Sequence, residues 1–279
     1  MPAAEAVPMN LPAFRRQGRL YEIPAATASP DYAIVIGTFA AVPYIHLHLE
    51  ARRRLYPHVP CLVHDDCSPV QERLLELCRQ YGAIFAANTT RFPPTLGDLS
   101  ALYDGLLWAD EIGAGILVKF SRRFVPITDW RPSLMRLVQA SDYHTYSSWT
   151  TSFNFGFRTE AMALAVEAWH KAGCVARIGE AIANWREVFV EGFVHNLARS
   201  IPLSAKAQAW DRRVGPRPAD RNGYAPWDWL GTDRCTATVH WLWHDSHGAD
   251  AYAELARFWG LPYQIADFLD PNMGHGTRP

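Results

Sequence analysis

The sequence lacks the features of a secreted or membrane-spanning protein. Its five cysteines are an odd number without paired spacing, which argues against a disulfide framework and a cysteine zinc site and favours reduced thiols. No apolar run approaches the roughly 20 residues of a membrane span, and residues 1–30 contain no apolar core flanked by basic residues. We therefore expect a cytoplasmic protein without a transmembrane segment, for which peripheral association with a membrane stays open.

The chain also lacks an excess of charge of either sign. A formal net charge of −1 over 279 residues gives no general attraction to nucleic acid, which we do not expect as a partner. Internal repeats and low-complexity tracts are absent as well. Since 49% of the residues are hydrophobic and 20% are charged, the composition is that of a globular protein with a substantial core.

Short apolar runs alternate with amphipathic segments along the first half of the chain. The expected strands are residues 32–38, 60–64, 83–87 and 115–120. The helices expected between them are 43–55, 70–81 and 97–112. This order implies an α/β fold with parallel strands joined by right-handed crossovers. The elements expected further on are helix 131–140, strand 143–147, helices 159–172 and 178–198, strand 236–243 and helix 249–259.

Two acidic residues, Asp65 and Asp66, follow the second expected strand. Ser68 is expected to cap the next helix, with Pro69 at its first position and Gln71 as the reciprocal cap. Capping is a common structural role for aspartate. If Ser68 fills that role, both carboxylates are available for a ligand.

The fourth expected strand ends in three cations and a serine. Lys119, Ser121, Arg122 and Arg123 stand where the apolar run 115–120 should emerge from the sheet. Ligands of open α/β sheets bind at the carboxyl ends of the strands. The group therefore indicates an anion site, and a solvated strand end whose arginines pair with surface carboxylates is the alternative.

The segments 36–39 (Ile-Gly-Thr-Phe) and 63–68 (Val-His-Asp-Asp-Cys-Ser) together resemble the nucleotide-binding half of GT-A glycosyltransferases, especially those of family 2. The resemblance implies a Rossmann-like, mostly parallel sheet flanked by helices, and a nucleotide-sugar donor with UDP preferred. It places Thr38 and Phe39 beside the nucleobase, and Asp65 and Asp66 at the base edge or the ribose. Carboxylates there accept charge-assisted hydrogen bonds from N–H and O–H donors.

The glycine-led helix of this family faces the donor, and the segment after Leu96 resembles it loosely. Gly97, Asp98 and Asp104 carry the match. The two aspartates are six residues apart and do not share a helix face. Asp98, nearer the helix start, is therefore the preferred donor-binding residue.

The resemblance fails at the fourth strand, where the family carries an Asp-x-Asp motif for Mg²⁺ or Mn²⁺. Aligned through Lys119, the acidic positions are occupied by Ser121 and Arg123, and a shift by two residues places Lys119 and Ser121 there. We therefore expect no metal cofactor, since Lys and Arg donors also stabilise a diphosphate leaving group. The residues expected at the diphosphate are Lys119, Ser121, Arg122, Arg123, His244 and His247.

The acceptor side resembles the family only partly. Asn154 and Arg158 are expected to face the acceptor or the donor sugar, and Glu191 is preferred to Glu187 as the general base, which favours inversion over retention. The domains implied are an irregular leader (1–30), a GT-A catalytic domain (31–202, with halves 31–125 and 126–202) and a C-terminal extension (203–279) that packs on it.

The function implied is metal-independent transfer of a hexosyl group to a glycan, a lipid-linked sugar or a small acceptor, as in polysaccharide biosynthesis. A sugar-nucleotide pyrophosphorylase is a second enzyme class with this sheet, but no glycine-rich basic signature follows the first strand. The non-enzymatic alternative is an inactive homologue that binds nucleotide or glycan.

Overall fold

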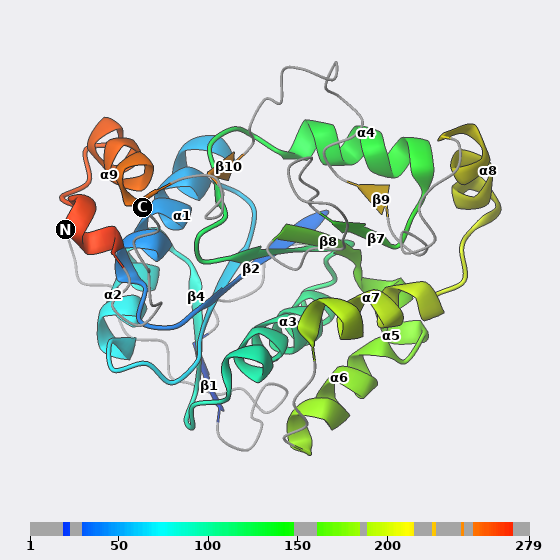
Figure 1. The fold of residues 1–279 in the computed structure, drawn as a ribbon, viewed down its shortest axis with the longest axis horizontal. Coiled ribbons are helices and arrows are strands. Elements are labelled where there is room, and N and C mark those ends of the chain that lie inside the picture. Colours follow the sequence, from blue (N-terminus) through cyan, green and yellow to red (C-terminus); the bar gives the residue numbers. More distant parts are fainter. Residues whose placement is uncertain are drawn as a thin grey trace, which may run out of the picture.

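The computed structural model describes residues 19–22, 30–147, 161–184, 189–214, 225–226, 241–242 and 248–269. Within them, eight strands form one sheet in the order β1-β4-β3-β2-β5-β8-β7-β9 (Figure 1). These strands are β1 (Arg19–Glu22), β2 (Tyr32–Thr38), β3 (Cys61–Asp65), β4 (Ile84–Asn88), β5 (Ile116–Ser121), β7 (Thr145–Ser147), β8 (Ala161–Ala165) and β9 (Ala225–Pro226). A separate antiparallel pair joins β6 (Val125–Pro126) to β10 (Trp241–Leu242).

The four strands predicted from the first half of the chain form a parallel unit at the centre of the sheet. β2 pairs in parallel with β3 on one side and with β5 on the other, and β3 pairs in parallel with β4. β1 and β8 run antiparallel to their neighbours β4 and β5. The carboxyl ends of β2, β3, β4 and β5 therefore meet at one edge, and the expected α/β fold with a mostly parallel sheet is confirmed.

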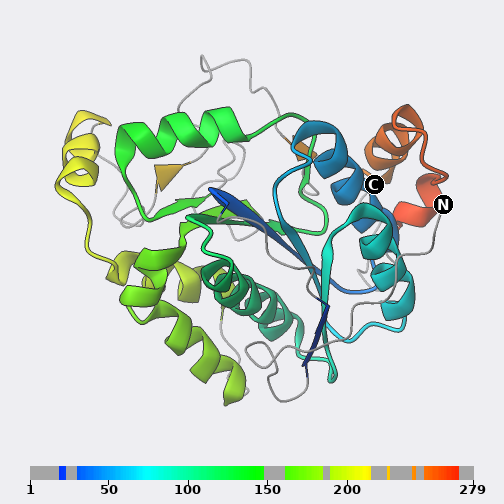
Figure 2. The same ribbon diagram turned by 180° about the vertical axis from the view of Figure 1, so that it is seen from behind.

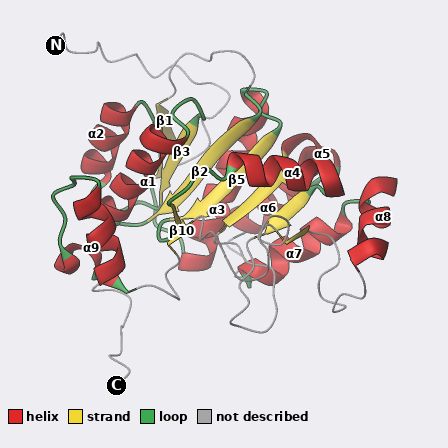
Figure 3. Ribbon diagram, turned by 90° about the horizontal axis from the view of Figure 1, so that it is seen from above, coloured by secondary structure: helices red, strands yellow, loops and turns green. Residues whose placement is uncertain are grey.

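Helices cover both faces of the sheet (Figure 1 and Figure 2). The helices are α1 (Val42–Leu55), α2 (Gln71–Tyr81), α3 (Pro94–Glu111), α4 (Arg131–Ser141), α5 (Val166–Lys171), α6 (Cys174–Ala183), α7 (Val190–Ser200), α8 (Ala205–Val214) and α9 (Ala249–Phe258). One core lies between the sheet and α1, α2 and α4, and a second lies between the sheet and α3, α5, α6 and α7. α9 and the short 3₁₀ helix η3 (Ile265–Phe268) pack on α1 through a third apolar cluster (Figure 3).

β2 shows why the central strands are continuous apolar runs. Ile34 and Ile36 enter the first core, whereas Ala33 and Val35 enter the second, because successive side chains of a strand point to opposite faces. A strand buried on both faces needs apolar residues at every position. Its last residue, Thr38, is the first polar side chain at the sheet edge.

α3 approaches the sheet at two glycines, where a larger residue would not fit. A Cβ at Gly105 would lie 2.7 Å from Val35 Cγ1, and a Cβ at Gly97 would lie 2.5 Å from Asp66 Oδ2. Both distances are below any normal contact between these atoms. The glycines therefore let the first turn of α3 approach the ends of the parallel strands.

Several predicted elements agree with the structure. The expected segments 43–55, 70–81, 131–140 and 249–259 are α1, α2, α4 and α9 within two residues at each end. Gly82 ends α2 in the left-handed conformation at φ 60°. None of the helices in the described part of the chain has the length and hydropathy that would let it cross a membrane.

Other predicted elements are wrong. Residues 161–165 form strand β8 instead of the first turns of a helix, since pairing with β5 and β7 overrides the helix preference of Ala-Met-Ala-Leu-Ala. The single helix expected over 178–198 is two helices, α6 and α7, because Phe189 has an extended backbone before α7. The leader expected over 1–30 contains a strand, β1, paired with β4.

The predicted cap of α2 is also wrong. α2 begins at Gln71 with Val70 at its N-cap, and no side chain caps it. Ser68 Oγ accepts only a long hydrogen bond from Val70 N, at 3.4 Å. This matters for the site because the backbone N–H of Ser68 is held by Asp65, as described below.

Candidate active site

The ends of β2 and β3 place Thr38 and Asp65 side by side. The two residues are partners in the parallel register, and their side chains are 7% and 0% exposed. Asp65 Oδ2 accepts a hydrogen bond of 2.7 Å from Ser68 N. Within the described residues, neither Asp65 Oδ1 nor Thr38 Oγ1 has a hydrogen-bond partner. A carboxylate oxygen and a hydroxyl with unused hydrogen-bonding capacity therefore lie together at the sheet edge.

Asp65 has both a structural role and a free oxygen. Its Oδ2 atom fixes the turn after β3, so the structural role that the sequence left open is present. Burial raises the pKa of Asp65 above its ordinary value, and its interactions with Ser68, Gln71 and His64 offset only part of this effect. An additional donor to Asp65 Oδ1 would favour the ionised form.

Asp66 is held by a buried polar network that runs back between the sheet and α3. Its Oδ1 atom accepts hydrogen bonds from Asn88 Nδ2 at 2.8 Å and from Phe92 N at 3.2 Å. Ser100 Oγ donates to Asn88 Oδ1 at 3.1 Å and lies 3.4 Å from the His64 ring. The network continues from His64 Nε2 to Asp104 Oδ2 at 2.8 Å. Asp66 is therefore rigidly placed, by partners that the sequence did not suggest.

Lys119 of β5 and Asp98 of α3 form a tight ion pair on the face of the sheet that α3 covers. The Lys119 ammonium lies 2.6 Å from Asp98 Oδ1 and 2.8 Å from Oδ2. The Lys119 side chain is 1% exposed, whereas that of Asp98 is 30% exposed. The charge of Lys119 is therefore matched by Asp98, which keeps an accessible carboxylate at the start of α3. Asp104, in contrast, is fully buried against His64.

Phe39, directly after Thr38, contacts two arginines. Arg122 Nη1 donates to the carbonyl oxygen of Phe39 at 2.8 Å. The guanidinium carbon of Arg91 lies 3.9 Å from the centre of the Phe39 ring. Arg91, in the loop between β4 and α3, was not among the predicted site residues. Its place after the third parallel strand is the signal that could have indicated it.

The turn after β5 is supported from behind by α1 and α9. His48 Nε2 lies 3.1 Å from the carbonyl oxygen of Ser121 and 3.0 Å from that of Arg122. Tyr252 Oη donates to the carbonyl of Arg123 at 2.6 Å. Burial lowers the pKa of His48 to about 4, although the two carbonyls raise it. A neutral His48 therefore donates one N–H to the turn at physiological pH.

Arg123 differs from Arg122 in its surroundings. It is 6% exposed, and its guanidinium carbon lies 5.7 Å from the centre of the Tyr44 ring. Arg122 and Ser121 are both half-buried. The three cations predicted at this strand end therefore differ in their surroundings. Lys119 and Arg123 are buried, whereas Arg122 is half-buried.

The loops after β2 and β3 both contain a strained backbone. Ala40 has a φ of 53° and Cys67 a φ of 55°, in the left-handed region that residues other than glycine rarely adopt. Such strain concentrates at binding and catalytic sites. The strained backbone at Ala40 and Cys67 lies at the same edge of the sheet as Thr38 and Asp65.

Of the remaining predicted residues, Glu191 is the one that lies in the described part of the chain. Glu191 is half-buried in the first turn of α7, and within the described residues no hydrogen bond or ion pair joins it to the strand ends. The predicted residues that lie outside the described part of the chain are Asn154, Arg158, Glu187, His244 and His247.

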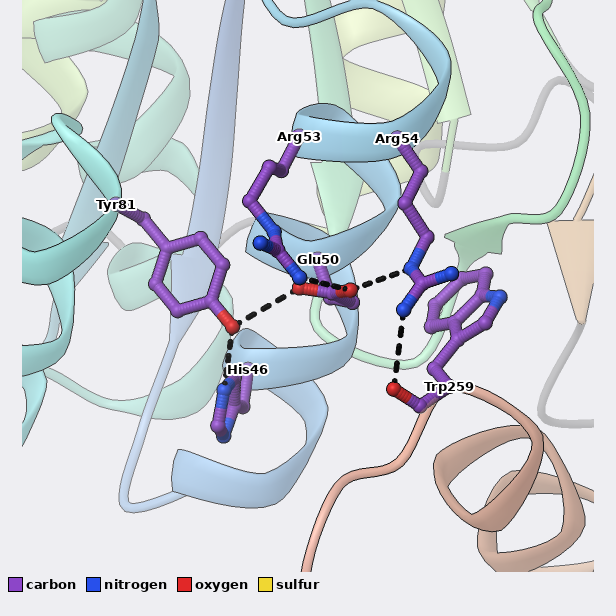
Figure 4. A network of polar contacts seen from close by, with 6 residues as sticks. All are labelled: His46, Glu50, Arg53, Arg54, Tyr81 and Trp259. Carbon is purple, nitrogen blue, oxygen red and sulfur yellow. Dashed lines mark hydrogen bonds and ion pairs between the residues drawn. The ribbon is translucent and has the colours of Figure 1, made fainter.

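A second polar cluster ties α1 to α2 and to the end of α9 (Figure 4). Its members are His46, Glu50, Arg53, Arg54, Tyr81 and Trp259. The Glu50 side chain is fully buried and accepts hydrogen bonds from both arginines and from Tyr81. Burial alone would raise the pKa of Glu50, but these donors outweigh it and lower the pKa to about 2. The Arg54 guanidinium also donates to the carbonyl of Trp259, so the cluster fastens the C-terminal segment to α1.

The end of β5 carries three cationic side chains. Mg²⁺ and Mn²⁺ are bound by carboxylate, carbonyl and water oxygens, whereas this strand end presents Lys119, Arg122 and Arg123. Across the described ranges, no group of three His, Cys, Asp or Glu side chains could hold a metal ion.

No protein-family model matches the sequence, and no curated protein matches it. Among solved structures, the chain is similar to the mannosyltransferase PcManGT from Pyrobaculum calidifontis in complex with GDP-Man and Mn²⁺, with 14% identity, a TM-score of 0.46 and coverage of 65% of this chain and 55% of that one. The chain is also similar to the glycosyltransferase GlyE of Streptococcus pneumoniae TIGR4, with 11% identity, a TM-score of 0.44 and coverage of 71% of this chain and 45% of that one. A third similar structure is a cytidylyltransferase from Leptospira borgpetersenii, with 11% identity, a TM-score of 0.39 and coverage of 70% of this chain and 80% of that one. The chain spans about half the length of the first two proteins.

Proposed function

We propose that the protein is a glycosyltransferase of the GT-A type that uses a nucleotide-sugar donor. The observation that carries the proposal is the pair of buried, unpartnered oxygen atoms Thr38 Oγ1 and Asp65 Oδ1 at adjacent strand ends. A buried polar group without a partner costs about 1–3 kcal/mol, so such a pair favours a ligand that supplies the missing hydrogen bonds. A nucleobase edge or a ribose offers the N–H or O–H donor that a carboxylate accepts.

The neighbouring carboxylates suit the rest of a nucleoside sugar. Asp98 is partly exposed, and Lys119 holds its carboxylate from the interior side, so Asp98 can accept hydrogen bonds from ribose or sugar hydroxyls. Asp66 is fixed by Asn88 and supports the same edge. We assign Lys119 to positioning Asp98 rather than to direct contact with the diphosphate, because its ammonium is already paired and buried.

We propose that the diphosphate leaving group is stabilised without a metal ion. Arg122 is the cation of the β5 end that lies beside Phe39, and its N–H donors match phosphate oxygens. The proposed acceptor is a glycan, a lipid-linked sugar or a small molecule, and the proposed general base is Glu191, which would give inversion. An inactive homologue that binds nucleotide or glycan is the second candidate, favoured by the lack of a described contact between Glu191 and the strand ends.

Thermal unfolding with a panel of UDP-, GDP- and dTDP-sugars tests the nucleotide site. One donor should raise the melting temperature of the wild-type protein, and Thr38→Val and Asp65→Asn should each reduce that shift. Asn at position 65 keeps an oxygen for Ser68 N, so the change is confined to the free oxygen. Asp110→Asn, on the exposed side of α3, is the control for loss of one charge. The proposal is refuted if no sugar nucleotide binds.

Turnover distinguishes the enzyme from the inactive homologue. The stabilising donor should be hydrolysed slowly or transferred, and Glu191→Gln should lower the rate by at least about a hundredfold if Glu191 is the base. Stabilisation without turnover would favour the inactive homologue. Activity that EDTA abolishes and Mn²⁺ restores would exclude the metal-independent mechanism.

A further inference from the structure

We propose that Arg91 is a second phosphate-binding residue, which forms with Arg122 a clamp on either side of Phe39 for the diphosphate of the nucleotide. The inference rests on the proposed function and assigns a residue to the site that neither the resemblance nor the predicted strand ends indicated.

The side chain of Arg91 is placed although it is exposed. Its guanidinium carbon lies 3.9 Å from the centre of the Phe39 ring, which is a close cation–π contact. The next residue, Phe92, donates its backbone N–H to Asp66 Oδ1 at 3.2 Å, so the loop that carries Arg91 is fastened to the end of β3. Within the described part of the chain, no carboxylate forms an ion pair with Arg91.

Arg122 reaches the same residue from another loop. Its Nη1 atom donates to the carbonyl oxygen of Phe39 at 2.8 Å, and His48 and Tyr252 hold the turn on which it lies. Phe39 thus fixes one guanidinium through its ring and the other through its backbone. Because Phe39 follows Thr38 directly, both guanidinium groups lie next to the proposed nucleoside site.

The placement of Arg91 leaves donors for a ligand. Its guanidinium lies over the Phe39 ring, and a guanidinium held against a ring face keeps its N–H donors in its own plane. An arginine already held in place also loses less side-chain entropy when an anion binds. Two such forks match the geometry of phosphate oxygens, which accept paired hydrogen bonds from arginine.

The local charge balance favours the same assignment. The charge of Lys119 is matched by Asp98, and Arg123 is buried against Tyr44. Arg91, which forms no ion pair with a carboxylate of the described residues, is therefore a cation placed to meet a diphosphate, and Arg122 lies beside it on the other side of Phe39. Without a metal ion, both are needed, since a nucleoside diphosphate brings more than one negative charge to the site.

Calorimetric titration of the full chain tests the clamp. The probes are UDP, GDP, dTDP, the corresponding nucleosides and inorganic pyrophosphate. Arg91→Ala should weaken binding of the diphosphates about 10- to 100-fold, the loss expected for charge-assisted hydrogen bonds, and should change nucleoside binding less than about twofold. Arg91→Lys keeps the positive charge but loses the forked guanidinium, so its diphosphate affinity should lie between those of the wild type and Arg91→Ala.

Phe39→Leu separates the two anchors, because it removes the ring beneath Arg91 and keeps the carbonyl that binds Arg122. It should weaken diphosphate binding about as much as Arg91→Lys. Arg136→Ala, which removes an exposed arginine from α4, is the matched control and should bind like the wild type. Circular dichroism of each variant checks that it is folded.

The outcomes separate this inference from the proposed function. Equal diphosphate affinities of Arg91→Ala and the wild type would overturn the clamp alone, and so would an equal loss for diphosphates and nucleosides, which would place Arg91 at the base. If the wild-type protein binds none of the nucleotides, both the clamp and the proposed function are wrong.

Discussion

His48 should make the folded protein sensitive to mild acid. The side chain is 2% exposed, and its Nε2 atom contacts the carbonyl oxygens of Ser121 and Arg122 at 3.1 Å and 3.0 Å. Burial lowers the pKa of His48 from 6.5 to about 4, although the two carbonyls oppose this effect. The folded protein therefore keeps this histidine neutral at pH values where the unfolded chain is already protonated.

The direction and size of the effect follow from the two pKa values. Between about pH 6.5 and about pH 4 the unfolded chain binds the additional proton, so the free energy of unfolding falls as the pH is lowered through this range. A difference of about 2.5 between the pKa values corresponds to about 3 kcal/mol in all, of which about 2 kcal/mol is lost by about pH 5. Above about pH 7 the contribution is fully present.

Urea unfolding of the wild type and of His48→Gln at about pH 7.5 and about pH 5 measures this contribution. Glutamine keeps an N–H donor for the turn but does not titrate. The wild type should lose about 2 kcal/mol more than the variant over this interval. Burial also lowers the pKa of His46, but this effect is present in both proteins and cancels. Equal losses in the two proteins would refute the assignment of a buried neutral His48.

Four substitutions test the packing around the site. Gly97→Ala places a Cβ 2.5 Å from Asp66 Oδ2 and should abolish the thermal shift caused by the sugar nucleotide; an unchanged shift would show that Asp66 is not needed. Gly105→Ala places a Cβ 2.7 Å from Val35 and should lower the urea-derived stability by about 1–3 kcal/mol despite the better helix propensity of alanine. Val35→Ala in the same chain should recover part of that loss, and strict additivity would contradict the clash. Tyr252→Phe removes the hydroxyl that holds the β5–β6 turn and should cost about 1 kcal/mol, together with a weaker nucleotide-induced shift.

The parallel half of the sheet could be predicted because its signals are local. β2, β3, β4 and β5 are short apolar runs with glycine, proline or polar residues at their ends, and Gly82 stops α2 as expected. The antiparallel half could not, since Ala161–Ala165 is a strand only because β5 and β7 offer it a hydrogen-bonding ladder. β1 likewise depends on the free edge of β4.

At the site, residue types were more predictable than their partners. Lys119 was expected at a strand end and Asp98 near a helix start, but their mutual ion pair depends on how closely α3 approaches the sheet, which only the glycines of α3 indicate. Asn88 and Arg91 were missed because their roles arise from contacts with Asp66 and Phe39, residues distant in the sequence. The remaining site predictions stay predictions.

The support of the β5–β6 turn by α9 has a consequence for how the protein is made. Tyr252 follows Arg123, whose carbonyl it holds, by 129 residues. At about 5–20 residues per second on the ribosome, these two groups leave the synthesis site about 6 to 26 seconds apart. The central parallel strands can therefore pair on the nascent chain well before their turn gains its last support. The proposed phosphate site is thus completed late in translation, and a polypeptide stopped before α9 would carry the sheet without the finished site.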